Sequence, residues 1–202
     1  MFELPNLILI RHGQSVWNAE NRFTGWTDVD LSDKGVGEAE EAGNELRNQT
    51  IDVVHTSDLI RAKRTAEIVM QSNVCSEGTV TKSDWRLNER NYGALQGLNK
   101  AETADKHGAE QVQIWRRSFD VAPPEGESLE MTAERTIPYF MEEILPDLES
   151  GVNVLVSAHG NSLRSIVMHI EGISPEDIVA FEIPTGVPRY YDYSDGKISL
   201  VG

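Results

Sequence analysis

The sequence predicts a single α/β domain with a mainly parallel central sheet and helices on both faces. Short apolar segments alternate along the chain with longer patterns of helical period, which is typical of such sheets. The length of 202 residues and the hydrophobic share of 39% suit one core, and no repeat, low-complexity tract or linker divides the chain. We therefore expect one domain over residues 1–202.

The first half of the chain predicts two strands, each followed by a helix. Residues 4–10 form an apolar run that is typical of a buried strand, and Ser32 caps the helix that follows. A second short strand is expected at residues 53–54, and Ser57 is expected to open the next helix. The apolar positions of the two helices, spaced by three to four residues, are Val36, Ala39, Ala42 and Leu46, then Leu59, Ala62, Ala66 and Val69.

The second half follows a middle segment without a regular pattern. Ser128 is expected to begin a longer helix that Pro146 ends, with apolar positions at Ala133, Ile137, Phe140 and Ile144. The remaining predicted elements are a strand at 152–156, a helix at 162–170, a helix start at 174–176 with proline at its first position, and a hairpin whose strands are 189–193 and 198–201.

Charge and composition exclude several classes of partner. The formal net charge of −15 disfavours nucleic acid and anionic lipid unless a local basic patch overrides it. No apolar run approaches the roughly 18 residues of a membrane span. The start lacks the basic residues and long apolar core of a signal peptide, and Cys75 has no partner for a disulfide, so we expect a cytoplasmic protein.

Two histidines follow apolar strands in the same local context. His12 and His159 each come directly after a predicted strand and directly before a glycine. Ligands of open α/β sheets bind at the carboxyl ends of the strands, and backbone amides near a helix start attract anions. If the two strands are neighbours, both imidazoles face one anion-binding crevice. His55, His107 and His169 lack this context and are interpreted as structural or surface groups.

Cationic residues lie near the same strand ends in the sequence. Arg11 follows four apolar residues, so it is expected to be partly buried and to need an anionic partner. Surface ion pairing is the alternative interpretation, for Lys63 and Arg64 in particular. The candidates for a focused anion pocket are Arg11, Arg61, Lys100, Arg116 and Arg117.

These parts suit phosphoryl transfer without a metal ion. The reaction needs an in-line nucleophile, stabilisation of charge on the phosphoryl oxygens, and an acid or base at the accepting oxygen. His12 can be the nucleophile, arginines can take the place of a metal, and Glu89 is the best candidate for the carboxylate. Metal hydrolysis lacks its motifs, since there is no H-E-x-x-H, no Cys/His cluster and no Asp-rich loop. Ser57 and Ser162 are interpreted as helix caps rather than nucleophiles.

The motifs resemble those of the cofactor-dependent phosphoglycerate mutases, a family within the histidine phosphatase superfamily. The resemblance is carried by RHGQSVWNAENRFTGWTDVDLSDKG, LNERNYGALQGLNKAETADKHG, WRRSFDVAPP, SAHGNSLR and IPTGVP, so it covers nearly the whole chain. RHG alone marks only the superfamily, which includes many phosphatases. The longer motifs favour the mutase branch.

The resemblance implies a reaction and the residues that perform it. His12 would carry the phosphoryl group, and Glu89 would donate and accept the proton. His159 would steady the moving phosphoryl group, with Arg11 and Arg61 beside it. The residues implied to bind substrate are Ser15, Asn18, Thr24, Gly25, Arg90, Tyr92, Lys100, Arg116, Arg117, Gly160 and Asn161. The implied reaction is the isomerisation of 3-phosphoglycerate and 2-phosphoglycerate in glycolysis and gluconeogenesis, with 2,3-bisphosphoglycerate as primer and intermediate, small phosphoglycerates as the only partners, and no metal.

Two departures from the longer family members affect the expectations. Longer family members carry an insertion between two segments that residues 123–129 connect directly in this chain. The chain is therefore expected to be a monomer or a small homo-oligomer. The sequence stops at Gly202 without their polar tail, which predicts easier access of water to a phosphorylated His12. A phosphatase of the same superfamily is the alternative function, and a non-catalytic phosphometabolite sensor is a third hypothesis.

Overall fold

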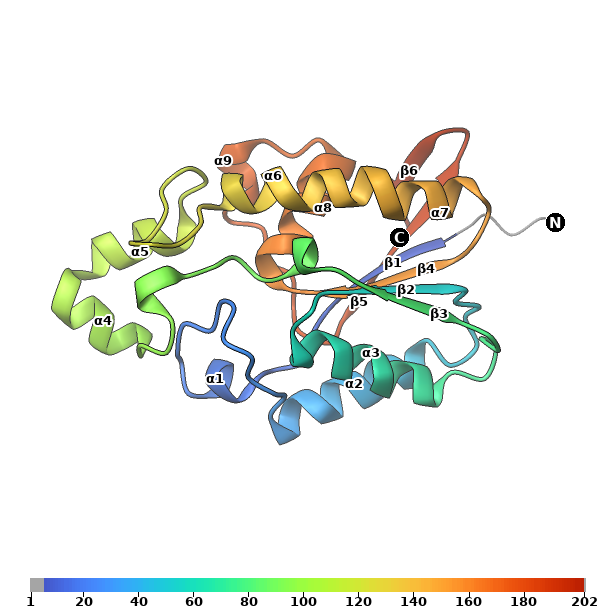
Figure 1. Cartoon of the computed structure of the whole chain (residues 1–202), viewed down its shortest axis with the longest axis horizontal. Helices are drawn as coiled ribbons and strands as arrows, with labels where there is room; N and C mark the ends of the chain where they lie inside the picture. Colours follow the sequence, from blue (N-terminus) through green and yellow to red (C-terminus); the bar gives the residue numbers. More distant parts are fainter. Residues whose placement is uncertain (1–5, 202) are drawn as a thin grey trace.

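A six-stranded sheet of order β3-β2-β4-β1-β5-β6 lies between two layers of helices in the computed structural model, which describes residues 6–201 (Figure 1). The strands are β1 (Asn6–Arg11), β2 (Val53–Thr56), β3 (Val80–Ser83), β4 (Val154–Ala158), β5 (Pro188–Ser194) and β6 (Lys197–Leu200). The first four strands run parallel, and β5 and β6 add an antiparallel edge. The mainly parallel sheet is confirmed; residues 4 and 5 of the first predicted strand lie outside the described residues.

Alternate side chains of β1 point to opposite faces of the sheet and enter two separate cores. Leu7 and Leu9 pack with residues of α6 (Leu129–Tyr139) and α8 (Gly160–Glu171). Ile8 and Ile10 pack with residues of α2 (Asp33–Glu45) and α3 (Ile60–Ser72) on the other face. A strand buried on both faces reads as a continuous apolar run, which explains the pattern of this segment and confirms helices on both faces.

The long helix that follows Ser128 does not end at Pro146. After α6 the backbone widens into one π-helical stretch, η3 (Phe140–Ile144), and then continues as α7 (Leu145–Glu149). Pro146 therefore falls in the first turn of α7, directly after the π-helical stretch. The predicted end was wrong because a sequence pattern does not reveal a π-helical turn.

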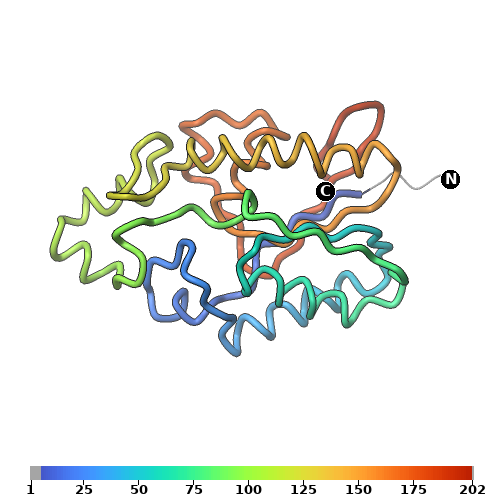
Figure 2. Tube along the Cα trace, in the orientation of Figure 1, coloured from blue at the N-terminus to red at the C-terminus, as the bar shows by residue number. Residues whose placement is uncertain are grey.

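The middle segment is more regular than expected. It contains β3, the short 3-10 turns η1 (Trp85–Leu87) and η2 (Gly93–Leu95), and the helices α4 (Lys100–His107) and α5 (Ala109–Arg117). The two helices form a lobe beyond the carboxyl end of β1, beside the short helix α1 (Val16–Ala19) (Figure 2). This lobe brings residues of the middle segment to the edge of the sheet where ligands are expected.

The helix starts confirm some of the predicted caps and correct others. Ser32 and Ser128 cap α2 and α6, as predicted. Ser57 is not the cap of α3, whose N-cap is Leu59. Ser162 lies inside α8, where its hydroxyl accepts a hydrogen bond from the amide of His159 at 3.2 Å. Ser162 therefore helps to cap α8 as part of a capping box with His159, so its predicted capping role is borne out, whereas Ser57 does not cap α3.

The carboxyl-terminal half also contains α9 (Pro175–Ile178), which starts as predicted with proline in its first turn. The β5–β6 hairpin is confirmed, with Asp195 and Gly196 at positive φ in its turn, as the tight hairpin turns of twisted strands require. Within residues 6–201 no helix is long and apolar enough to cross a membrane.

Candidate active site

The two histidines of matched context lie side by side, because their strands are neighbours in register. Arg11 of β1 pairs with Ala158 of β4, so His12 and His159 both follow directly at the carboxyl edge. Their ring centroids are 4.9 Å apart, and both side chains are almost fully buried. The two imidazoles are therefore neighbours, as expected for adjacent strands, although only His12 lines the cavity described below.

The environment of His12 keeps its imidazole neutral and fixes its tautomer. Nδ1 lies 2.7 Å from the carbonyl oxygen of Gly13, and a carbonyl can only accept, so Nδ1 carries the proton and Nε2 has a free lone pair. Burial and the positive charges of Arg61 and Arg11 hold the pKa of His12 well below its usual value. A neutral imidazole with a free Nε2 is the nucleophilic form.

Glycine at position 13 is required by close packing behind this histidine. A Cβ on Gly13 would lie 2.2 Å from the carbonyl oxygen of Gly35 in α2, closer than any side chain tolerates. The Gly13 amide also donates to Thr65 Oγ1 of α3 at 3.1 Å. The segment after β1 is thus fixed against two helices, and with it the ring of His12.

His159 is held by Ser57, a contact that the sequence did not indicate. The hydroxyl of Ser57 and Nε2 of His159 are 2.7 Å apart, and both residues are fully buried. Burial, followed by the charge of Arg61 and the neighbouring His12, keeps the pKa of His159 well below its usual value. His159 therefore enters the site as a second neutral imidazole.

Two arginines lie near the histidines, and among residues 6–201 their guanidinium groups donate hydrogen bonds only to neutral carbonyl groups. Arg61 is 1% exposed and donates to the carbonyl oxygens of Gly25 at 2.7 Å and Thr27 at 3.1 Å. Burial lowers the pKa of Arg61 to about 10, which still leaves it charged at neutral pH. Arg11 donates to the carbonyl of Ile183 at 2.9 Å, and its buried Nε has no partner among the described residues. An anion in the cavity would supply the missing partner for both.

Glu89 reaches the same site from the segment after η1. Its Oε1 accepts from the amides of Arg90 at 2.8 Å and Asn161 at 3.1 Å, and from the Asn161 side chain at 3.0 Å. Burial opposes its ionisation, but these donors and the charges of Arg11 and Arg61 together lower the pKa of Glu89. The amide at the start of α8 thus binds this carboxylate, where the sequence suggested that it would bind the ligand. A Cβ on Gly160 would lie 3.5 Å from the Arg11 guanidinium carbon and 3.7 Å from Glu89 Oε2, so both groups converge there.

A cavity opens beside these groups at the carboxyl edge of the sheet. Among the residues lining it, seven are arginine or lysine and two are glutamate, in a chain of net charge −15. The predicted site residues that line it are Arg11, His12, Asn18, Thr24, Gly25, Arg61, Glu89, Tyr92, Lys100, Arg116, Arg117, Gly160 and Asn161. The five cations predicted to form an anion pocket therefore line one and the same cavity.

Three predicted residues support the cavity from behind instead of lining it. Ser15 caps α1, accepting from the amide of Asn18 at 3.1 Å, and its own amide donates to Asn18 Oδ1 at 3.2 Å, which orients that side chain. Arg90 is 1% exposed, stacks on the ring of Tyr92, and donates to its hydroxyl at 3.1 Å. His159 lies behind His12, against Ser57.

Four further lining residues were missed by sequence reasoning: Arg22, Phe23, Arg164 and Glu182. Arg22 and Phe23 belong to the RFTGW motif, and Arg164 ends SAHGNSLR, so their place in quoted motifs was a usable signal. Arg164 donates to the side chain of Asn161 at 3.2 Å. Glu182 pairs with Arg117 and Arg164, and nothing in its local sequence marks it as a cavity residue.

The chain is similar to known proteins of one superfamily. The model of the histidine phosphatase superfamily (branch 1) matches residues 7–202. A 2,3-bisphosphoglycerate-dependent phosphoglycerate mutase from Protochlamydia amoebophila is 49% identical and is aligned over 95% of this chain and 96% of its own. One from Cytophaga hutchinsonii is 51% identical over 98% of this chain and 91% of its own. The solved phosphoglycerate mutase from Bacillus anthracis has the same fold, with a TM-score of 0.82, 22% identity, and coverage of 98% of this chain and 92% of that one.

Proposed function

The chain belongs to the histidine phosphatase superfamily, and on that premise we propose that it is a 2,3-bisphosphoglycerate-dependent phosphoglycerate mutase. It would interconvert 3-phosphoglycerate and 2-phosphoglycerate in glycolysis and gluconeogenesis. One observation carries the proposal: the neutral His12, the carboxylate of Glu89 and the buried arginines converge on one cationic cavity. The relatives at about half identity favour a mutase over a phosphatase of the same superfamily.

His12 and Glu89 divide the chemistry between nucleophile and proton carrier. In the first half-reaction the Glu89 carboxylate takes the proton from the C2 hydroxyl of 3-phosphoglycerate as that oxygen attacks the phosphorus on His12 Nε2. The P–N bond breaks and a C2–O–P bond forms. In the second half-reaction Nε2 attacks the C3 phosphoryl group, and Glu89 returns its proton to the leaving C3 oxygen. The proton taken from the C2 hydroxyl is thus returned to the C3 oxygen, and His12 is phosphorylated again.

The arginines and His159 would stabilise the negative charge on the phosphoryl oxygens during the transfer. Carbonyl oxygens anchor Arg11 and Arg61 without neutralising their charge, so both guanidinium groups would stabilise phosphoryl oxygens in place of a metal ion. His159, whose ring centroid lies 4.9 Å from that of His12, would donate to the same group. Their burial keeps water away and strengthens each of these interactions.

The positive charge of the cavity favours a ligand with two phosphoryl groups. 2,3-Bisphosphoglycerate would supply the phosphoryl group that first loads His12. The buried Nε of Arg11 has no hydrogen-bond partner among the described residues. Arg11 would therefore hold the phosphoryl group at His12. Lys100, Arg116 and Arg117 line the same cavity and would hold the second phosphoryl group and the carboxylate. We further propose that residues 1–202 work as one catalytic domain in the cytoplasm.

Turnover of 3-phosphoglycerate by the wild-type protein tests the proposal. With bisphosphoglycerate as primer, enolase-coupled isomerisation is expected to exceed the release of inorganic phosphate from the same sample. Brief incubation with labelled bisphosphoglycerate is expected to leave an acid-labile, base-stable phosphate on His12, and His12→Ala should abolish both the label and the turnover. Folded protein that releases phosphate without isomerising would instead be a phosphatase. Binding of bisphosphoglycerate that survives His12→Ala, without any labelled protein, would indicate a sensor.

A further inference from the structure

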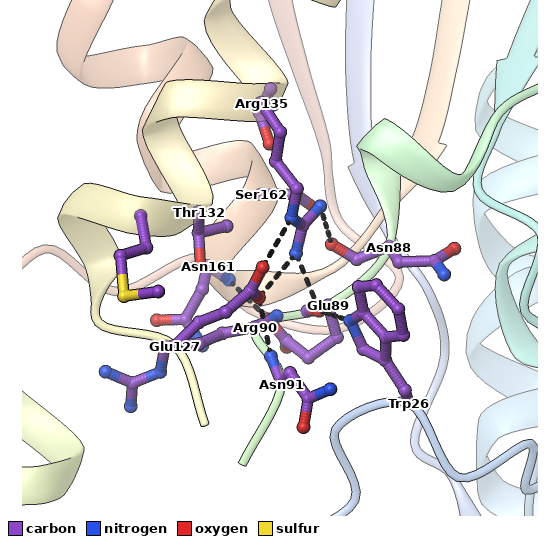
Figure 3. Close-up of polar contacts among 12 residues, drawn as sticks. Trp26, Asn88, Glu89, Arg90, Asn91, Glu127, Thr132, Arg135, Asn161 and Ser162 are labelled. Carbon is purple, nitrogen blue, oxygen red and sulfur yellow. Dashed lines mark hydrogen bonds and ion pairs between the residues drawn. The ribbon is translucent and has the colours of Figure 1, made fainter. Parts of the chain in front are cut away.

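Glu89 owes its position to main-chain contacts outside the cavity. Its own carbonyl oxygen accepts two hydrogen bonds, from Trp26 Nε1 at 2.6 Å and from Arg135 Nη2 at 2.9 Å. Arg135 belongs to α6, and Figure 3 shows its guanidinium reaching down from that helix to Asn88, Glu89 and Glu127. It does not line the cavity, and no role for it follows from the reaction as proposed.

Arg135 uses all five of its N–H donors. Nε and Nη2 bind the two carboxylate oxygens of Glu127, each at 2.9 Å. Nη1 binds the carbonyl oxygens of Arg86 at 2.8 Å and Asn88 at 3.0 Å, and the fifth donor binds the Glu89 carbonyl. Five donors in a rigid planar fork are a property of arginine alone, since lysine offers three from one point.

Glu127 completes the arrangement from the other side. While it pairs with Arg135, its Oε2 also accepts from the amide of Asn91 at 2.8 Å (Figure 3). Both side chains of the pair are largely buried, at 8% and 16% exposure. The pair therefore fixes the main chain on both sides of Glu89, at residues 86–89 through Arg135 and at Asn91 through Glu127.

The indoles of Trp26 and Trp85 limit the movement of the guanidinium. The Arg135 guanidinium carbon lies 5.5 Å from the centre of the Trp26 ring and 6.0 Å from that of Trp85. Trp26 follows Gly25, whose carbonyl binds Arg61. The same contacts thus connect the loop that anchors a catalytic arginine to the segment that carries the carboxylate.

We infer that Arg135, paired with Glu127, is a positioning residue that fixes the main chain around Glu89 and so aims its carboxylate at the transferring proton. The inference rests on the proposed role of Glu89 as proton carrier. Proton transfer demands a donor and acceptor within hydrogen-bond reach, and a displacement of 1 Å can cost about 10²-fold in rate. The substrate-binding cations are not held by Arg135, so its loss should act on kcat and not on KM.

Three substitutions on this pair, with a fourth on a neighbouring residue as control, test the inference. Arg135→Lys keeps the charge and loses the fork; Arg135→Met loses both. Both should lower kcat by about 10- to 100-fold, with KM within about threefold of wild type. Glu127→Gln keeps an acceptor for Asn91 and loses the ion pair, and it should lower kcat by about tenfold. The matched control is Thr136→Val, which removes the neighbouring 3.0 Å bond from Thr136 to the Arg86 carbonyl and should leave kcat unchanged.

Urea unfolding of every variant shows which ones are folded under the assay conditions, and Glu127→Gln carries the test if both Arg135 variants fail to fold. An Arg135→Lys enzyme with wild-type kcat would overturn the inference, because charge alone would then suffice. A rise in KM that matches the loss of kcat, or an equal loss in Thr136→Val, would overturn it as well. Absence of wild-type turnover would instead refute the proposed mutase, and the inference, stated for that reaction, would fall with it.

Discussion

Glu182 forms an ion pair with Arg117 in the wall of a cavity that is otherwise rich in positive charge. The same carboxylate lies 3.5 Å from the guanidinium of Arg164. Since Arg117 is a candidate for binding the substrate, Glu182 competes with the anionic groups of the ligand for it. The side chain of Glu182 is 61% exposed, so it can swing away at little cost.

Glu182→Gln is therefore expected to tighten substrate binding. KM for 3-phosphoglycerate should fall by up to about fivefold, the equivalent of the roughly 1 kcal/mol that an exposed ion pair can contribute. The measurement is a coupled assay at low ionic strength, where surface charges are least screened. Glu149→Gln, an exposed loss of the same charge at the end of α7, serves as the control. A KM equal to that of the control would contradict the competition.

His12 is expected to be neutral and to carry its proton on Nδ1. Burial and the charges of Arg61 and Arg11 lower the pKa of His12, so its imidazole should titrate only below pH 6.5. Long-range ¹H–¹⁵N NMR spectra of the unliganded protein report both the titration and the tautomer. Arg61→Met should move the titration to higher pH, since a neighbouring positive charge disfavours the imidazolium. A protonated Nε2 at neutral pH would refute the proposed nucleophile.

Glu89→Gln tests the proton carrier without changing the size of the side chain. The amide can still accept from Asn161 and Arg90, but it cannot take a proton. Turnover should fall by about 10²- to 10⁴-fold, the usual contribution of a positioned acid or base. The urea midpoint shows whether the variant is folded. A loss below tenfold would remove Glu89 from this role.

The sequence predicted the sheet and the two histidines well, because both depend on local pattern. A strand buried on both faces is a continuous apolar run, so β1 and β4 were recognisable, and His12 and His159 followed from their ends. The helices of the middle segment were not predicted, since α4 and α5 are short and carry few apolar residues. Their apolar contacts gather in a small separate cluster of Phe23, Leu95 and Val112.

The contacts that sequence reasoning missed join residues far apart in the chain. Ser57 precedes a helical pattern and so resembles a cap, yet its hydroxyl meets His159 across the site. Arg135 occupies a helical position that reads as surface, and only the packing of α6 over residues 86–89 shows its acceptors. Local patterns identify the element that a residue belongs to, while such pairings depend on how elements pack.

His55 is a further histidine with a buried role, in the stability of the fold rather than in the site. From β2 it bridges the hydroxyl of Tyr139 in α6 and the carboxylate of Asp147 in α7, each at 2.8 Å. Burial lowers the pKa of His55 and Lys82 adds to this, against the opposing charges of Asp147 and Glu143. The folded protein therefore binds a proton at His55 less readily than the unfolded chain, whose histidines titrate near 6.5.

The sign of the resulting pH dependence follows from that difference. Above pH 6.5 neither state is protonated at His55, and its contribution to stability is complete. As the pH falls from 6.5 through the lowered pKa, the unfolded chain takes up a proton that the folded protein does not, and the free energy of unfolding decreases. His12 and His159 act in the same direction, while Asp147, whose pKa is lowered from 3.8, stays ionised in this window.

His55→Gln should therefore reduce the acid sensitivity of the protein while lowering its stability at neutral pH. Urea unfolding at pH 7, 6 and 5 should show a decline smaller than that of wild type by up to about 1.4 kcal/mol per pH unit, the value of one proton. His107→Gln, which removes an exposed histidine from α4, controls for the substitution itself. If His55→Gln declines as steeply as wild type over this range, His55 does not contribute to the acid sensitivity, and the other two buried histidines carry it.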